Sequence, residues 1–146
     1  MICIRDAAPD DEPEWRRLWD GYNKFYKAHV DPEITAHTWA RIIAPGSMVI
    51  GRIAEVDGLI RGFSISILHE GTWTLTPICY LEDLFVDPAC RGQGIGRALI
   101  QDLMNRARKE NWSRLYWHTQ HNNPARKLYD EFVEADDFVR YRILLQ

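Results

Sequence analysis

The sequence is poor in cysteine and contains no Cys-x-x-Cys pair. Its 146 residues include only 3 cysteines, at positions 3, 79 and 90. Disulfide-stabilised secreted domains and cysteine-based zinc sites need more cysteines, usually in pairs at short spacing. We therefore expect a reduced protein with neither a disulfide framework nor a structural zinc site.

Long apolar runs are also missing. No stretch approaches the roughly 18 apolar residues needed to cross a bilayer. Residues 1–15 turn polar and acidic after the first few positions, where a secretory signal would place an apolar core. These features predict a cytoplasmic protein that does not bind a membrane.

Positive charge is not in excess. The chain carries 18 Lys and Arg against 21 Asp and Glu, which gives a net charge of −3 and a pI of about 5.9. Nucleic-acid binding depends on basic surfaces, so the overall charge gives no reason to expect such a partner. A small cationic substrate is electrostatically easier to accommodate.

The residues that are abundant indicate one globular domain. Hydrophobic residues make up 46% of the chain and include six tryptophans, enough for a sizeable core, while 27% of residues are charged, as on an ordinary folded surface. The length is typical of one domain, and no repeat or linker-like segment divides it. We therefore expect a single domain spanning residues 1–146.

Hydrophobic spacing predicts an α/β fold, in the broader sense α+β, with a mixed central sheet flanked by helices. Apolar residues recur at helical spacing after Asp11, whereas the middle of the chain is rich in β-branched residues around an Asp57-Gly58 hairpin signal. The order β-α-α-β-β-β-α-β-α-β follows from these expected elements: strand 2–5, helix from 11, helix 33–43, strands 48–56, 60–68 and 78–86, helix to 110, strand 115–118, helix from 124 and strand 138–145.

A glycine-rich turn, Arg91-Gly92-Gln93-Gly94-Ile95-Gly96, joins the strand at 78–86 to the long helix after it. Glycines let backbone N–H groups approach an anion, and the start of a helix adds its dipole and free donors, so the turn suits a pyrophosphate. The spacing fits neither a P-loop, which needs Lys-Ser/Thr after the last glycine, nor the G-x-G-x-x-G dinucleotide fingerprint. A tight turn without a ligand remains the alternative interpretation.

This turn resembles the R/Q-x-x-G-x-G/A acetyl-CoA loop of the GCN5-related N-acetyltransferases, the GNAT superfamily. The resemblance covers nearly the whole chain, because the element order also matches. Three further segments carry it: Ile4-Arg5-x-Ala7 at the start, Tyr80 to Pro88 as the fourth strand, and Asn122-x-x-Ala125-x-x-Leu128-Tyr129 as the last helix. The segment Leu-Glu-Asp-Leu-Phe-Val is similar to the branch with spermidine/spermine and yeast histone/polyamine acetyltransferases.

The resemblance implies an enzyme that transfers the acetyl group of acetyl-CoA to a primary amine by direct attack, without a metal. Its acceptor would be a polyamine, an amino acid or another small amine, in preference to a protein lysine. The alternative is a non-catalytic acyl-CoA-binding sensor or regulatory module. Relatives of this branch pair through C-terminal strands, so residues 138–145 would form a homodimer.

Two neighbouring acids lie in an otherwise apolar strand. Strict alternation places Glu82 with Leu84 and Val86 on one face, and Asp83 on the other. An alkylamine has a pKa near about 10 and must lose a proton before it attacks. By the resemblance, Glu82 binds the acceptor ammonium and deprotonates it through water. The alternative is a carboxylate satisfied by an arginine or the backbone, and that structural interpretation is our expectation for Asp83.

The resemblance also assigns the remaining site residues. Tyr129 would protonate the departing thiolate, although it shares an apolar helix stripe with Leu128 and Phe132 and could be a core aromatic. A backbone N–H near Leu84 to Val86 would polarise the thioester carbonyl. The residues expected to contact the coenzyme are Leu84, Phe85, Val86, Arg91, Gly92, Gln93, Gly94, Ile95, Gly96, Arg97, Asn122, Asn123, Pro124, Ala125 and Tyr129.

The remaining sequence patterns give weaker indications of function. The pair His118-x-x-His121 has no third ligand nearby, so we expect no metal site. Cys90 has no base beside it and is expected to be a small turn residue. The segment after Tyr129 lacks the glycine that these enzymes usually place there and is acidic instead. We expect that segment to be a solvated connection.

Overall fold

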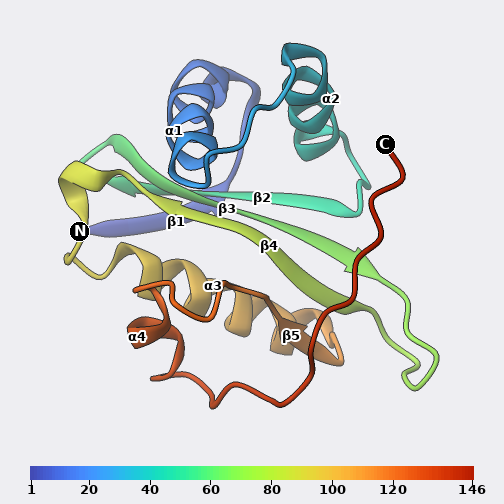
Figure 1. Cartoon of the computed structure of the whole chain (residues 1–146). Coiled ribbons are helices and arrows are strands. Elements are labelled where there is room, and N and C mark those ends of the chain that lie inside the picture. The colour runs from blue at the N-terminus through green and yellow to red at the C-terminus, as the bar shows by residue number, and fades with distance from the viewer.

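The computed structural model describes all residues, 1–146, and its centre is a five-stranded sheet (Figure 1). The strands are β1 (Ile2–Asp6), β2 (Val49–Val56), β3 (Leu59–His69), β4 (Ile78–Val86) and β5 (Arg114–Tyr116), and they lie side by side in that order. The first four are antiparallel to their neighbours, whereas β5 runs parallel to β4. The sheet is therefore mixed, as expected.

Helices cover both faces of the sheet. On one face lie α1 (Glu12–Phe25) and α2 (Pro32–Ile43), and on the other lie α3 (Ile95–Glu110) and the short α4 (Arg126–Tyr129) (Figure 1). Single 3-10 turns at Pro9–Asp11 and Pro88–Cys90 precede α1 and the glycine-rich loop. No helix is both long and apolar enough to span a bilayer.

The hairpin between β2 and β3 forms where the sequence indicates. Asp57 and Gly58 both adopt left-handed backbone conformations, with φ of 53° and 80°. Two-residue hairpin loops of type I′ need positive φ at both positions, which asparagine, aspartate and glycine tolerate best. The turn thus fixes the register Val56↔Leu59 from which the rest of the pairing follows.

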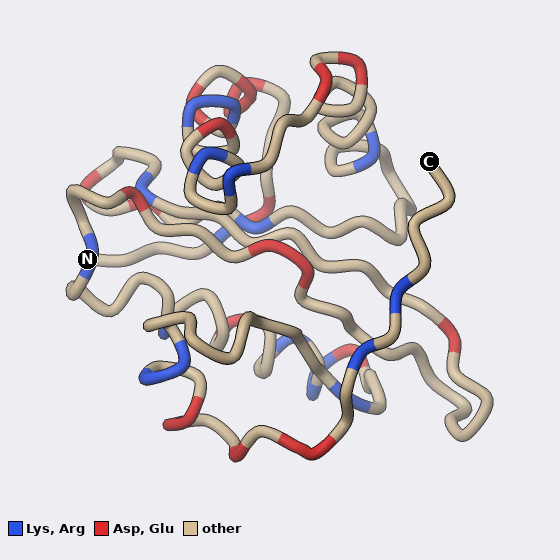
Figure 2. Tube along the Cα trace, viewed as in Figure 1, with Lys and Arg blue, Asp and Glu red and all other residues tan.

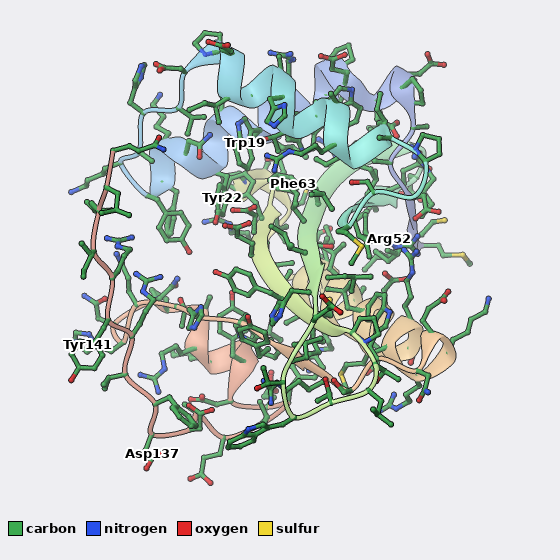
Figure 3. All side chains as sticks on the ribbon, turned by 90° about the vertical axis from the view of Figure 1, so that its right-hand side faces the viewer. Trp19, Tyr22, Arg52, Phe63, Asp137 and Tyr141 are labelled. Atoms are coloured by element: carbon green, nitrogen blue, oxygen red, sulfur yellow. The ribbon has the colours of Figure 1, made fainter.

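Each face of the sheet has its own core. Between the sheet and helices α1 and α2, Trp15 stacks on Trp19 and packs against Trp39 and Phe63. Figure 3 shows Trp19 and Phe63 in this layer. Beneath α3, Leu99 and neighbouring aliphatic residues are fully buried. Fully burying one such side chain stabilises the fold by about 1.5–3 kcal/mol, so α1 and α3 are held firmly against the sheet.

The expected closing strand at 138–145 is wrong for the single chain. This segment has no secondary structure and passes outside the β5 edge toward α2 without joining the sheet (Figure 1). Its apolar side chains are exposed, with Phe138 at 87% and Tyr141 at 92%, and Figure 3 shows Tyr141 pointing away from the sheet. A strand requires a neighbour for its backbone groups, and this segment has none within its own chain.

The last helix is also shorter than expected. The hydrogen bonds continue as turns from Asn123 to Val133, but only Arg126–Tyr129 is regular α-helix. Phe132 still packs against the α3 core, whereas Val133 is exposed. The chain leaves the core here, and the acidic stretch that follows lies at the bottom of the molecule in Figure 2.

Candidate functional site

The strands β4 and β5 pair over only three residues and then separate. Their register runs from Ile78↔Arg114 to Tyr80↔Tyr116 and ends there. Beyond Tyr80, β4 keeps β3 as its only strand neighbour. One edge of the segment Leu81 to Val86 is therefore free to offer backbone donors and acceptors to a ligand.

A cleft of about 670 Å³ lies along this free edge. That volume falls within the range of small-molecule sites. Its walls come from the end of α1, the end of β4, the glycine-rich loop and start of α3, and the region of α4. It brings together these residues from the expected set: Leu84, Phe85, Val86, Arg91, Gly92, Gly94, Ile95, Gly96, Arg97, Asn123, Pro124, Ala125 and Tyr129.

Two expected contacts do not line the cleft, and several unexpected residues do. Gln93 and Asn122 lie outside the lining, as does Glu82. The aromatic residues at helical spacing after Trp15 continue to Tyr26, and this spacing is the sequence signal for a contribution of α1 to the cleft. The lining residues outside the expected coenzyme-contacting set are Phe25, Tyr26, Cys90, Lys127, Leu128 and Glu131.

One end of the cleft is built to hold an anion. Gly92 and Gly94 have φ of 80° and 85°, a region that side-chain-bearing residues rarely adopt. Gly94 is the N-cap of α3, so the free N–H groups and the positive dipole end of a 16-residue helix face this loop. Cationic side chains at Arg91, Arg97 and Lys127 surround it.

Side-chain contacts hold the start of the glycine-rich loop and one part of the cleft wall. The buried Asp87 accepts a hydrogen bond from Ala89 N–H at 3.0 Å and lies 3.3 Å from Arg17, and these partners lower the pKa of its carboxyl. The Arg91 guanidinium donates to the Val86 carbonyl at 3.2 Å. Arg97 and Glu131 both line the cleft and pair at 2.7 Å, so part of the acidic stretch contacts the cleft.

Gly96 allows α3 and α4 to approach closely. A Cβ at this position would lie 3.2 Å from a methyl group of Leu128. That is tighter than ordinary van der Waals contact, so a larger residue would push α4 outward. The third glycine of the loop therefore positions the residue that follows Leu128, which is Tyr129.

Tyr129 reaches the cleft from α4 with its ring against Trp117, at a centroid distance of 5.5 Å. Burial, together with the nearby Tyr26, raises the pKa of its phenol to about 12. The hydroxyl therefore stays protonated at neutral pH and can donate a proton. Asn123 connects the two walls, because its side-chain amide donates to the Tyr26 hydroxyl at 3.3 Å and its oxygen accepts from Ala125 N–H at 2.9 Å.

The two acids of β4 do not alternate as expected. A bulge pairs Leu81 with Ser66 and Asp83 with Ile65, and leaves Glu82 without a partner. Glu82 is exposed, while Asp83 is partly buried. Burial is the main cause that raises the pKa of the Asp83 carboxyl, and the charge of the neighbouring Glu82 adds to this effect.

An aromatic cluster covers the sheet where β4 and β5 still pair. Tyr80 stacks on Tyr116 at 5.1 Å, and His69 shares a 2.8 Å hydrogen bond with the Tyr116 hydroxyl. His118 lies against Tyr80, at 5.4 Å between ring centroids. No group of three or more His, Cys, Asp or Glu side chains in the molecule could hold a metal ion.

The comparisons with known proteins agree with this geometry. Residues 12–132 match the profile of the Acetyltransferase (GNAT) family. The chain belongs to the GNAT acetyltransferase family. It is an N-acetyltransferase by family, and the mixed five-stranded sheet with flanking helices is the GNAT fold.

Named relatives cover almost the entire chain. The D-amino-acid N-acetyltransferase HPA3 of Saccharomyces cerevisiae is 33% identical over 144 residues, which cover 97% of this chain and 89% of HPA3. The uncharacterised N-acetyltransferase YhfO of Bacillus subtilis is 30% identical over 142 residues, which cover 94% of this chain and 94% of YhfO. The structure of a ribosomal-protein-alanine N-acetyltransferase from Brucella melitensis superposes with a TM-score of 0.84, at 26% identity over 99% of this chain and 100% of that one.

Proposed function

We propose that this GNAT enzyme transfers the acetyl group of acetyl-CoA to the primary amine of a small molecule. The observation that carries the proposal is the single cleft that joins an anion-binding loop to a protonated phenol. Gly92, Gly94 and the start of α3 suit a pyrophosphate, and the free edge of β4 suits the amide groups of an extended pantetheine arm. The loop, the cleft and the cationic rim therefore fit the coenzyme.

The residue roles below are part of the same proposal. The exposed Glu82 binds the acceptor ammonium and draws its proton away through water. The neutral amine attacks the thioester carbonyl, whose oxygen a backbone N–H near Leu84 to Val86 polarises. The C–S bond then breaks, its electron pair goes to sulfur, and Tyr129 gives its proton to that sulfur, while the surplus proton on the newly acylated nitrogen restores the Tyr129 hydroxyl.

The acceptor is proposed to be an amino acid or a polyamine. Support for an amino acid comes from the name of HPA3, which is similar to this chain over nearly its full length. Support for a polyamine comes from the two carboxyls of β4 and from the absence of a cation that pairs with them. Both acceptors are small enough for a site on one chain.

The first experiment is free-thiol release from acetyl-CoA across a panel of amines. The panel holds D- and L-amino acids, spermidine, spermine, diamines, an aminoglycoside and a histone-like peptide, and calorimetry follows acetyl-CoA binding in parallel. We expect an amine-dependent rate with a small acceptor. Binding without turnover on any amine would instead favour a coenzyme-binding sensor, and absence of binding would contradict the assignment of the loop.

Replacing Glu82 by Gln is expected to lower kcat/KM for the amine at least about 10-fold, because an ammonium loses its ionic partner. Acetyl-CoA affinity, measured by calorimetry, should remain unchanged, because Glu82 lies outside the cleft lining. An equal loss of amine turnover and coenzyme affinity would show that Glu82 has a structural role.

We further propose that two chains pair through residues 138–145. The exposed apolar side chains of this segment have no partner in their own chain, and β5 offers a free sheet edge. Light scattering at micromolar concentration is expected to give twice the chain mass of 17.1 kDa, and a chain ending at Asp137 is expected to be monomeric. A monomeric full-length chain would contradict the proposal.

A further inference from the structure

The aromatic cluster at the end of the β4–β5 pairing lies outside the hydrophobic cores. Tyr80 stacks on Tyr116 with an interplanar angle of 20°. The rings of His69 and His118 stand nearly perpendicular to Tyr116, at centroid distances of 5.7 Å and 5.8 Å. Neither tyrosine belongs to the three buried clusters, and both are only partly buried. Core packing therefore does not explain why four aromatic rings gather here.

Hydrogen bonds hold these rings by their edges. A carbonyl oxygen can only accept, so the Nδ1–H of His69 donates to the Glu70 carbonyl at 2.8 Å. In the neutral ring the other nitrogen, Nε2, then accepts from the Tyr116 hydroxyl at 2.8 Å. The Tyr80 hydroxyl lies 3.5 Å from Nδ1 of His118. The polar edges of the two tyrosines are thus occupied within the cluster, which leaves π surface to contact a ligand.

Strand alternation fixes the face of the sheet on which the cluster lies. Leu81, Leu115 and Trp117 pack beneath α3. Side chains alternate along a strand, so Tyr80, the neighbour of Leu81, points to the opposite face. Tyr116 lies between Leu115 and Trp117 and points the same way. The cluster therefore belongs to the face on which α1 and α2 lie, whereas α3 lies on the other (Figure 1).

Charges of both signs act on the Tyr80 phenol. Glu82 follows two residues later, and the rise of a strand keeps their Cα atoms within about 7 Å. Burial is the main cause that raises the pKa of the Tyr80 phenol, and the charges of Glu82 and Asp83 add to it. The positive charge of Arg140 acts against them. An ammonium held by Glu82 therefore has the cluster within reach, but a second ammonium beside Tyr80 would be repelled by Arg140.

We propose that the aromatic cluster binds the ring of an aromatic amino acid whose amino group is the acceptor, with Tyr80 and Tyr116 as specificity-determining residues. The inference rests on the proposed amine acetylation and names its acceptor class. Only two carbon atoms separate the ammonium of such an amino acid from its ring, so the ammonium lies at Glu82 while the ring packs on the cluster. Aromatic pairs stabilise one another beyond the apolar area that they bury. A polyamine would instead bring a second ammonium toward Arg140.

Relative rates on matched acceptors test this assignment. Phenylalanine and alanine carry the same ammonium and carboxylate and differ only in the ring. With thiol release as the assay, wild-type kcat/KM should be at least about 10-fold higher for phenylalanine than for alanine of the same configuration, because the ring is buried on binding. Both D- and L-forms are measured, and the ratio is taken within the preferred one.

Two variants should lower this phenylalanine-to-alanine ratio. Tyr116→Leu and Tyr80→Leu keep apolar bulk but remove one ring of the stack, and each should reduce the ratio about 5-fold or more. Both rates come from one preparation, so the ratio does not depend on how much of the variant is folded. Tyr116→Phe keeps the ring and loses only the bond to His69, so it should retain most of the ratio. Trp73→Leu, a 94% exposed aromatic between β3 and β4, is the matched control and should leave the ratio unchanged.

The possible failures are distinguishable. Equal wild-type rates on phenylalanine and alanine, or an unchanged ratio in both leucine variants, would overturn the inference while amine acetylation stands. A wild-type preference for spermidine over phenylalanine that is lost in Tyr116→Leu would mean that the rings bind a cation, and the inference would again be overturned. A wild-type protein that binds acetyl-CoA yet acetylates no amine overturns the proposed function, and the role of the cluster with it.

Discussion

Tyr129→Phe is expected to lower kcat about 100-fold or more at pH 7.5 while leaving the Kd for acetyl-CoA close to that of the wild type. General acids contribute about 10²–10⁴-fold, and phenylalanine keeps the contact with Trp117 while removing only the proton donor. Stopped-assay thiol release and calorimetry on the same preparation separate the two quantities. Tyr141→Phe is the matched control, because that hydroxyl lies outside the cleft on a side chain that is 92% exposed.

The wild-type pH profile adds a second check on Tyr129. An acid must be protonated to act, and burial raises the pKa of this phenol to about 12. Ionisation of Tyr129 should therefore cause no fall in kcat between pH 7 and pH 10. Full activity of Tyr129→Phe would assign the proton to another donor, and Tyr129 would then be a wall of the cleft.

Gly94→Ala is expected to weaken acetyl-CoA binding about 10-fold or more. At a φ of 85° an added Cβ meets no neighbour, so the cost comes from the backbone, about 1–2 kcal/mol for a left-handed alanine. The loop can relieve that strain only by rotating, which turns its N–H groups away from the bound anion. Calorimetry with acetyl-CoA measures the loss.

Gly58→Ala is the matched control for this strain. Gly58 has a φ of 80° and equally open surroundings, but it lies in the hairpin between β2 and β3. Both variants should lower the free energy of unfolding by a similar amount in urea, since both force alanine into the same region. Only Gly94→Ala should lose coenzyme affinity. Equal affinity in the two variants would mean that the loop does not contact the anion.

The sequence predicts best where local chemistry decides the structure. The bounds of β4, Ile78–Val86, agree with expectation, because Pro77 and Pro88 punctuate the chain on either side of the strand. The end of α3 at Glu110 also agrees with expectation. The glycines of the loop also predicted that the loop lies at the start of α3. These features depend on residues a few positions apart.

The features that sequence analysis missed depend on partners far away in the chain. The bulge at Glu82 exists only in the pairing with β3, so alternation along β4 alone placed Asp83 with the wrong neighbours. The contribution of Phe25 to the cleft depends on how α1 crosses β4. Residues 138–145 have the apolar content of a strand, but no edge in the same chain receives them.

The two ends of helix α1 differ in how deeply their side chains are buried. Its first turns bury Trp15 and Leu18, whereas Phe25 and Tyr26 at its end are exposed and line the cleft. Substitutions at exposed positions usually change stability by no more than about 0.5 kcal/mol. Substitutions at the end of α1 can therefore reshape this wall of the cleft while the rest of the helix keeps the scaffold folded.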